Sequence, residues 1–583
     1  MTVGAREPVR RRAGDVHEPY RVLSDPDPFG PATSTLTELQ RAQLRSAAAY
    51  HSLLHPGAEV ELRVSVGSIE QSPVLAYPGG DAPQPTGAAP GSGDPALVLR
   101  LRSLGGEAAA TPSSASPDSA SPIVREARIA HPDATVETTR PAVQQSLPRR
   151  VYDVLELRAP WLIDVLREAV TRRRARRIAR PLPRARFGSA DAATGTVPAP
   201  AAPAADGPPA ILFGLHWLQP SGAERWAVET IGIARRLGFL PIVVTDHDSV
   251  HPWLTRPELA DALVLALTQE PVRPVAGDAD LLEALLRRYD VRGAVIHHSD
   301  WLYAALPALK RLRPELPVVD SLHVIEYLGG GFAGRAVEYD DGIDHHHVIS
   351  PQLVDWLRDV QGVDAAKIGL APLARLTAGA ERGFAARGAA PEAPRPDPAA
   401  VPFTIACVGR LSRQKRPDLF LQLVHRLQRR GADYRAILHG GGESRPLVDA
   451  LIRRYGLEKR VELRDESTPV GQTYADSDLL VIPSLNEGLT LTTFEAIAAG
   501  IPVLSADVGS QRTIVEGEML VPWRARGFLR AAIPLIADFA SGGAAGEARR
   551  ERAWRAQRDR TRAFAALPDA HHHFEGLLST WRR

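Results

Sequence analysis

Short apolar runs alternate with longer amphipathic stretches from residue 209 to residue 540. The first series of runs lies at 211–213, 242–244, 294–296, 318–319 and 348–349, with helical periods such as 278–290 and 301–313 between them. The second series lies at 403–409, 435–439, 461–464, 479–483 and 502–505. Apolar strands that alternate with helices predict parallel sheets covered on both faces. We therefore predict an α/β protein with two Rossmann-like, doubly wound parallel-sheet domains that face a cleft.

The residues before 209 follow a different pattern. Strict alternation at Glu59–Val66 and Leu97–Leu101 predicts strands of a small sheet of unknown purpose. Three segments rich in Pro, Gly, Ala and Ser lie at 78–95, 105–122 and 188–209. Such segments bury too little apolar surface to order themselves, so we predict linkers or loops there.

The chain of 583 residues is longer than one hydrophobic core usually supports, so we expect several domains. We divide it into an N-terminal extension with low-complexity linkers (1–150), a basic helical segment and linker (151–208), a first Rossmann-like domain (209–376), a second Rossmann-like domain (402–540) and a helical tail (541–583). A Pro/Ala-rich insert at 377–401 separates the two Rossmann-like domains.

Charge and cysteine content narrow the class of protein. Lys and Arg number 70 and Asp and Glu 68, and the net charge of +2 argues against a globally electrostatic partner such as nucleic acid. The single cysteine, Cys407, lies in an apolar strand pattern and favours a reducing compartment. Residues 1–15 lack the apolar region of a secretory signal, and no run of about 18 apolar residues predicts a membrane span. We expect a cytoplasmic protein.

The first strand of the second domain ends in a loop with two positive charges. Between Gly409 and Pro417, Arg410 offers a fixed fork of donors and Lys415 a point charge, which together suit a diphosphate. Pro417 fits the first turn of the following helix. A solvated basic loop is an equally good interpretation of this segment alone.

A second loop, at 483–490, follows the fourth strand of the same domain. The backbone N–H groups predicted to hold a phosphate or sugar oxygen there are those of Gly488, Leu489 and Thr490. Glu487 lies in the loop and Glu495 about two turns into the next helix, so both carboxylates are expected to face one pocket as hydroxyl acceptors. An ordinary helix-surface residue is the alternative for Glu495.

Five ordered segments between 403 and 517 resemble the retaining GT-B-fold glycosyltransferases of glycosyltransferase family 4, the glycosyl transferases of group 1. The segments are the Gly-Arg-Leu…Gln-Lys-Arg-Pro loop at 409–417, the turn at 440–443, Ala-Asp-Ser-Asp at 475–478 before a strand that ends in Pro-Ser, the pair Glu487 and Glu495, and Ala-Gly-Ile-Pro-Val at 499–503. A looser match covers 209–540.

The resemblance implies an enzyme that moves a sugar from a UDP- or GDP-linked donor to an acceptor hydroxyl with retention of configuration. It implies that Arg410 and Lys415 neutralise the donor diphosphate, that Glu487 contacts the donor sugar and that Glu495 binds the ribose hydroxyls. No metal or other cofactor is implied, because the cations and the helix start stabilise the leaving group. After the roles that the resemblance implies, we call the second Rossmann-like domain the donor domain and the first the acceptor domain.

The acceptor domain resembles the family more loosely. Gly222 lies in the loop after its first strand, where the family's glycine-rich loop approaches the diphosphate. His323 ends a strand where the family carries an active-site histidine, which implies a place near the donor sugar. His297 and His298 end another strand and are predicted to line the acceptor side. The loop Tyr327–Gly334, with four glycines, is either a mobile acceptor lid or a plain flexible turn.

Two departures from the family's pattern leave details open. Glu-Gly-Phe-Gly becomes Glu-Gly-Leu-Thr at 487–490, which leaves the donor sugar unassigned. The family's interdomain Asn-Gly-Val-Asp is replaced by Ala-Pro-Leu-Ala-Arg at 371–375, so we expect an unusual hinge.

Three motifs that suggest metal binding fit other roles better. The Asp-Ser-Asp at 476–478 precedes an apolar strand and is expected to end a helix. The histidine triplets at 345–347 and 571–573 are consecutive, and consecutive side chains point in different directions on a strand or a helix. We predict no metal site.

The segment from Val151 to Arg186 combines apolar positions, among them Trp161 and Leu166, with eight arginines toward its end. It either rests on an anionic membrane surface as a peripheral contact or packs on the catalytic core with a solvated basic end. Nucleic-acid contact is disfavoured, because no aromatic platform accompanies the arginines.

The sequence therefore predicts a transferase with a glycan or lipid-linked acceptor, in cell-surface polysaccharide or glycolipid synthesis at or near the inner face of the membrane. The alternative from another class is a non-catalytic binding or scaffold protein that acts through its N-terminal region. A nucleotide-sugar epimerase or a phosphorylase lacks support, since no lysine is placed to hold a cofactor aldehyde.

Overall fold

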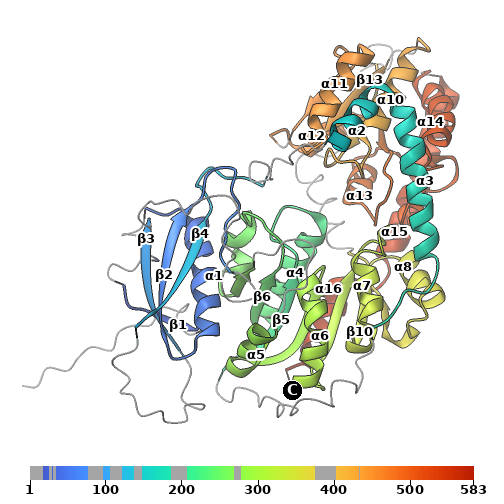
Figure 1. The fold of residues 1–583 in the computed structure, drawn as a ribbon. Helices are drawn as coiled ribbons and strands as arrows, with labels where there is room; N and C mark the ends of the chain where they lie inside the picture. The colour runs from blue at the N-terminus through green and yellow to red at the C-terminus, as the bar shows by residue number, and fades with distance from the viewer. Residues whose placement is uncertain are drawn as a thin grey trace, which may run out of the picture.

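The computed structural model describes residues 17–24, 29, 35–76, 96–104, 121–136, 147–185, 207–267, 278–373, 402–431, 434–465, 467–541 and 543–582. It contains a small N-terminal sheet and the two parallel sheets predicted for the Rossmann-like domains, so the predicted fold class is confirmed. In Figure 1 the small sheet lies beside the acceptor domain, on the side away from the donor domain. The segments at 77–95, 105–120, 186–206 and 374–401, which hold most of the predicted linkers and the insert, lie outside the described residues.

The acceptor-domain sheet has the strand order β11-β10-β9-β8-β5-β6-β7, with every pair parallel. Its strands are β5 (Pro209–Leu215), β6 (Leu240–Thr245), β7 (Leu263–Ala266), β8 (Asp290–His297), β9 (Val318–Leu322), β10 (His345–Val348) and β11 (Ile368–Leu370). Helices α4 (Gly222–Arg236), α5 (Asp278–Arg288), α6 (Asp300–Leu312), α7 (Phe332–Glu338) and α8 (Pro351–Asp355) connect them. The sequence analysis did not single out the short edge strands β7 and β11.

The donor-domain sheet has the order β14-β13-β12-β15-β16-β17, again with every pair parallel. Its strands are β12 (Phe403–Val408), β13 (Tyr434–His439), β14 (Val461–Arg464), β15 (Leu479–Ile482), β16 (Val503–Ala506) and β17 (Leu520–Val521). Its helices are α10 (Pro417–Gln428), α11 (Arg445–Tyr455), α12 (Val470–Ala475), α13 (Leu491–Ala498), α14 (Ala525–Ala540) and α15 (Ala544–Ala565). The strand order reverses between β12 and β15, and between β5 and β8 in the other sheet. Loops at such switch points form binding crevices.

The small sheet is built from β1 (Tyr20–Val22), β2 (Glu59–Val66), β3 (Leu97–Ser103) and β4 (Ile123–Ile129) in the order β1-β3-β2-β4. Helix α1 (Glu38–Leu54) packs between it and the β7 edge of the acceptor domain. Ser46 of α1 accepts a hydrogen bond from the backbone of Ala266 at 2.8 Å. A Thr37-to-Gln40 capping box starts α1, and this signal was present in the sequence but overlooked. The small sheet thus extends the acceptor domain.

Helices α2 (Leu147–Arg158) and α3 (Pro160–Ile178) pack on the donor domain. Asp164 of α3 pairs with the fully buried guanidinium group of Arg416 at 2.9 Å. Arg416 lies in the loop after β12 with φ +55°, a conformation that non-glycine residues seldom adopt. The packing interpretation of this segment is therefore confirmed for the inner face of α3.

Beyond α3 the chain continues onto the acceptor domain. Trp356 donates its indole N–H to the carbonyl oxygen of Ile178 at 2.8 Å, and Gln361 accepts from the backbone of Leu182 at 2.8 Å. Residues 147–185, which we call the brace, therefore contact both Rossmann-like domains. In Figure 1 the brace runs along one side of the molecule from one domain to the other.

The last helices also contact different domains. Helix α15 packs on α13 and α14 of the donor domain, whereas α16 (Ala570–Thr580) packs on α4 of the acceptor domain. Trp581, just after α16, lies so close to β8 that a Cβ on Gly293 would approach its ring to 2.3 Å. The tail therefore provides a second link between the domains.

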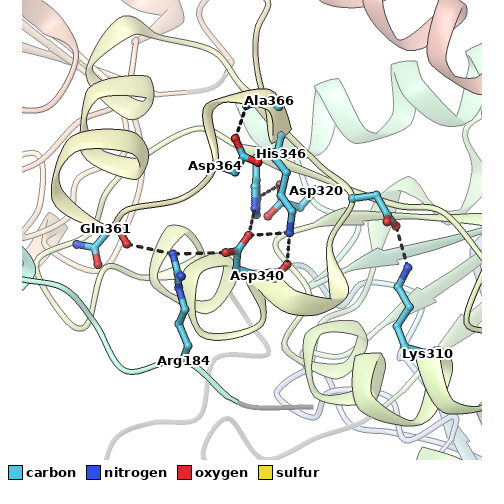
Figure 2. Close-up of polar contacts among 10 residues, drawn as sticks. Arg184, Lys310, Asp320, Asp340, His346, Gln361, Asp364 and Ala366 are labelled. Carbon is cyan, nitrogen blue, oxygen red and sulfur yellow. Dashed lines mark hydrogen bonds and ion pairs between the residues drawn. The ribbon is translucent and has the colours of Figure 1, made fainter. Parts of the chain in front are cut away.

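The far end of the brace is anchored at a buried charge cluster, shown in Figure 2. His346 of β10 lies between two carboxylates, with Nδ1 2.9 Å from Asp320 and Nε2 3.2 Å from Asp340. Asp340 also contacts Lys367 at 3.2 Å and Arg184 of the brace at 3.4 Å. Burial alone would lower the pKa of His346, but the two carboxylates outweigh it and raise that pKa to about 9.

The charged state of His346 makes stability depend on pH. The pKa is about 9 in the fold against 6.5 ordinarily. The stabilisation is therefore complete below about pH 6.5 and is lost as the pH rises through about 9. We expect the free energy of unfolding to fall by on the order of 3 kcal/mol between about pH 6.5 and about pH 9.5 in the wild type, and by clearly less in His346→Gln. Urea unfolding followed by circular dichroism at both pH values measures the difference.

His345→Gln is the matched control for this measurement. Burial lowers the pKa of His345 to about 4, so this neighbour stays neutral throughout the pH window. The control should keep the pH slope of the wild type. Equal slopes in the wild type and in His346→Gln would contradict the assignment.

Candidate active site

The predicted diphosphate loop after β12 packs on the glycine turn after β13. The backbone N–H of Leu411 donates to the carbonyl oxygen of Gly441 at 2.7 Å. A Cβ on Gly440, whose φ is +140°, would lie 2.1 Å from the carbonyl oxygen of Gly409, so only glycine fits. This close packing fixes the backbone from which Arg410 projects.

Lys415 and Glu487 form an ion pair in the pocket between the loops that follow β12 and β15. The Nζ–Oε1 distance is 2.7 Å, and the Glu487 carboxylate is buried while the Lys415 side chain stays partly exposed. Arg410, which is exposed, lines the same shallow pocket. The structure therefore brings three predicted site residues together at the switch point of the donor-domain sheet.

The loop that carries Glu487 is held from behind by a turn that the sequence analysis did not single out. A Cβ on Gly509 would lie 1.6 Å from the carbonyl oxygen of Glu487. The buried side-chain amide of Gln511 donates to the carbonyl oxygen of Gly488 at 3.3 Å and to Thr490 Oγ1 at 3.1 Å. These contacts fix the backbone N–H groups of the predicted phosphate-binding loop, with Leu489 between them. Nothing in the local pattern marks Gln511, because its side-chain partners lie 18 to 23 positions earlier.

Glu495 is placed differently from the prediction. Helix α13 begins at Leu491, so Glu495 lies about one turn into it, and the predicted two turns were wrong. The residue before the helix, Thr490, is extended and accepts a hydrogen bond from Gln511 at 3.1 Å. Glu495 does not line the Lys415 pocket. It accepts a hydrogen bond from Tyr474 at 2.9 Å, and burial raises its pKa.

Hydrogen bonds fix the protonation state of His323 on the opposite side of the cleft. His347 Nε2 donates to the carbonyl oxygen of Ala371 at 2.8 Å. Burial lowers the pKa of His347 to about 3, so its Nδ1 carries no proton and accepts from Ser321 Oγ at 2.8 Å. Ser321 Oγ in turn accepts from His323 Nε2 at 3.0 Å. Since burial also lowers the pKa of His323 far below its usual range, this ring is neutral with its lone pair on Nδ1.

His298 lies beside His323 at the end of β8. The ring centroids of the two histidines are 4.9 Å apart, and His298 stacks on Phe332 at 4.8 Å. His298 has φ +56°, a strained value for a non-glycine residue, and burial lowers its pKa to about 4. The glycine-rich loop Tyr327–Gly334 therefore packs onto this side of the cleft through Phe332.

His297 occupies a different environment from its neighbour. Its Nε2 lies 2.8 Å from Thr230 Oγ1 of α4, and its ring stacks on Phe574 of α16 at 6.3 Å. Burial holds the pKa of His297 well below its usual range. The structure thus places His298 in ring contact with His323, whereas His297 packs against α4 and α16.

Glu224, in the first turn of α4, is a buried carboxylate to which the sequence analysis gave no role. Its Oε1 accepts from Trp217 Nε1 at 2.8 Å and pairs with His216 at 2.8 Å, while Oε2 has no hydrogen-bond partner among the described residues. Burial would raise the pKa of Glu224, but the hydrogen bond and charge of His216 outweigh it and lower the pKa. The carboxylate lines a small pocket with His298 and His323. Its unpartnered oxygen is itself buried.

The two sides of the site touch across the cleft. A Cβ on Gly488 would lie 2.3 Å from the carbonyl oxygen of His323, and one on Gly222 would lie 3.5 Å from Leu491. The donor loop can approach His323 this closely only because Gly488 has no side chain. Two groups of predicted residues, one on each domain, thus form one site.

Within the described residues, no three His, Cys, Asp or Glu side chains are arranged to hold a metal ion. The two histidine triplets meet through His345 and His573 at 2.9 Å, but the other histidines of β10 face different partners. Asp476 ends α12, as predicted, and pairs with Arg464 at 2.7 Å.

Part of this chain is similar in sequence to known glycosyltransferases. Residues 402–538 match the family described as glycosyl transferases group 1. D-inositol 3-phosphate glycosyltransferase of Nocardia farcinica is 30% identical over 249 residues, which cover 38% of this chain and 53% of that protein. Lipopolysaccharide core biosynthesis mannosyltransferase LpsB of Rhizobium meliloti is 33% identical over 118 residues, 19% of this chain and 34% of that protein. The chain thus spans about half or less of the length of these relatives.

Among solved structures, Anabaena HepE in complex with UDP is similar over 64% of this chain and 98% of its own, with 19% identity and a TM-score of 0.46. The matched residues 402–538 include Arg410, Lys415, Glu487 and Glu495. This part of the chain therefore resembles a glycosyl transferases group 1 domain.

Proposed function

We propose that the protein is a glycosyltransferase that moves a sugar from a UDP- or GDP-linked donor to an acceptor hydroxyl with retention of configuration. The observation that carries the proposal is the pocket in which Arg410, Lys415 and Glu487 meet, opposite His323. Two cations beside a helix start suit a diphosphate, and a buried carboxylate suits a sugar hydroxyl.

Lys415 exchanges partners when the donor binds. Its ammonium group pairs with Glu487 in the structure. A diphosphate takes over the ammonium group, and the Glu487 carboxylate then accepts hydrogen bonds from sugar hydroxyls. Glu495 holds the ribose hydroxyls with the oxygen that does not accept from Tyr474.

The transfer itself breaks the bond between the sugar C1 and the diphosphate oxygen. Lys415 and Arg410 stabilise the charge that develops on the leaving phosphate, without a metal ion. The acceptor oxygen forms its bond to C1 on the same face, and its proton passes to the leaving phosphate oxygen. The configuration at C1 is therefore retained.

The acceptor-domain residues orient the hydroxyls. The Nδ1 lone pair of His323 accepts a hydrogen bond from the donor sugar, and the buried carboxylate of Glu224 holds His216 beside it. His298 and the loop that carries Phe332 shield these contacts from water. The similarity to a mannosyltransferase of lipopolysaccharide core biosynthesis supports an acceptor in cell-surface glycan or glycolipid synthesis. The single buried Cys407 suits a reducing cytoplasm.

A panel of UDP-, GDP- and ADP-linked sugars tests the proposal. We expect one donor to raise the Tm of the wild-type protein and to be hydrolysed slowly, with equal rates in the presence and absence of a chelator. Nuclear magnetic resonance of the released sugar should show the anomer of the donor.

The same panel distinguishes the alternatives. Loss of turnover with the chelator would contradict the metal-free mechanism, and the opposite anomer would contradict retention. No response to any donor would contradict the transferase and favour a scaffold protein that acts through the N-terminal extension.

A further inference from the structure

Helix α3 of the brace turns its acidic residues toward the donor domain. The inner face carries both of the helix's acidic residues. Asp164 pairs with Arg416, and Glu168 accepts from the backbone N–H of Ala525 at 2.6 Å. Ile163 and Ile178 are buried on the same face. Carboxylates are therefore absent from the outer face of α3.

The outer face begins with an apolar half. Large apolar side chains stand in solvent there, with exposed fractions of 65% for Trp161, 55% for Val165, 53% for Leu166 and 49% for Val170. With Val154 of α2, five of the thirteen exposed large apolar side chains among the described residues lie within this helix pair. Of the other eight, six lie on or next to the small N-terminal sheet (Leu23, Val66, Ile69, Val98, Leu104 and Val124). A group of exposed apolar side chains on neighbouring turns of one helix pair indicates a contact surface.

The second half of the outer face is basic. Its exposed side chains are Arg172, Arg173, Arg174, Arg176 and Arg177. No ion pair joins these five to a carboxylate within the described part of the chain. An apolar surface that continues into unpaired arginines is complementary to a layer of acyl chains beneath anionic headgroups.

The length and support of α3 suit such a surface. Its 19 residues span roughly 28 Å, so the helix can lie along a bilayer. Contacts to both Rossmann-like domains hold it in place, as Figure 1 shows for its course and Figure 2 for the Arg184 anchor. Among the described residues, no single helix is long and apolar enough to cross a bilayer. The helices Ala525–Ala540 and Ala544–Thr580, bent by 119° at their junction, are long and apolar enough only when taken together.

We infer that the outer face of α3 docks the protein on an anionic lipid bilayer. Trp161, Val165, Leu166 and Val170 enter the region between headgroups and acyl chains, and the arginines that follow bind lipid phosphates. The brace then places both domains against the same surface. This docking rests on the surface of α3 alone and does not require the proposed transferase activity.

A single polarity-sensitive label tests the docking on the full chain. Cys407 is the only cysteine, and burial raises the pKa of its thiol to about 12, so it stays unlabelled in the folded protein. A label on Val165→Cys is expected to shift to the blue with vesicles of phosphatidylglycerol and phosphatidylcholine, and not with phosphatidylcholine alone. Adding Arg173→Glu and Arg177→Glu should weaken the vesicle affinity at least about tenfold, since each basic residue near an anionic surface contributes about 1 kcal/mol.

Val98→Cys is the matched control, because Val98 is an exposed valine on β3 of the small sheet. Its label should stay in water with either kind of vesicle. An unchanged spectrum at Val165→Cys, or an equal blue shift at both positions, would overturn the inference. A shift produced by a short RNA but not by vesicles would assign the face to nucleic acid, and a shift produced by protein concentration alone would assign it to a second copy of the chain; either result would also overturn it.

Discussion

Lys415→Ala is expected to lower kcat/KM for sugar transfer about 1000-fold. The substitution removes the ammonium group that stabilises the leaving diphosphate, and it also leaves the buried Glu487 carboxylate without its partner at 2.7 Å. The negative carboxylate of Glu487 then faces the negative diphosphate when the donor binds. Donor affinity therefore falls, and so does the rate of the chemical step. Initial rates with the donor identified by the panel, together with the Kd of the free nucleotide, measure both effects.

Lys459→Ala is the control for Lys415→Ala. Lys459 is an exposed lysine of the same domain, away from both strand ends, so the same substitution there should leave kcat/KM and the Tm unchanged. Lys415→Arg keeps the charge and should recover part of the rate. Wild-type kcat/KM in Lys415→Ala would refute the role of this side chain, provided that the Tm shows a folded protein.

Gly488→Ala is expected to lower kcat at least about 100-fold while nucleotide binding stays near the wild-type level. The new methyl group would lie 2.3 Å from the carbonyl oxygen of His323, and neither backbone can yield without separating the domains. The backbone N–H of residue 488 remains, so the diphosphate contact survives. The donor loop and His323 can no longer approach one another, and misplacement of reacting groups by about 1 Å costs about 100-fold.

Small-angle scattering and calorimetry separate this effect from misfolding. The radius of gyration of Gly488→Ala with nucleotide should exceed that of the wild type, and the nucleotide Kd should differ by less than about threefold. Gly576→Ala, in open space on α16, is the control and should change neither quantity. Full turnover in Gly488→Ala would show that the contact seen between the domains is not needed for catalysis.

The donor-side residues were predictable because their signals are local. Strand β12 and the loop that carries Arg410 and Lys415 lie within about 15 consecutive residues, and the same holds for β15 and Glu487. Parallel strands end at one edge of a sheet, so two such loops meet when their strands are neighbours. The error at Glu495 concerns a helix whose N-cap residue, Thr490, is bonded to a residue outside the local segment, Gln511.

The acceptor side was less predictable, because its chemistry depends on contacts between distant segments. The tautomer of His323 depends on Ser321, His347 and Ala371, which lie on different elements. Glu224 looks like an ordinary residue of a helix start until burial and its unpartnered oxygen are known. His297 and His298 share one motif, yet only one of them contacts the ring of His323.

The sequence by itself determined the two parallel sheets, their strand ends and the family of the donor domain, because period, loop chemistry and motif order are properties of neighbouring residues. Only the tertiary structure decided which face of α3 is buried, since large apolar residues occur all around its first half and the choice rests on the pairing of Asp164 with Arg416, 252 positions away. It also decided the approach of Gly488 to His323 and the charged state of His346. Burial and electrostatic partners belong to the folded chain, and no local pattern contains them.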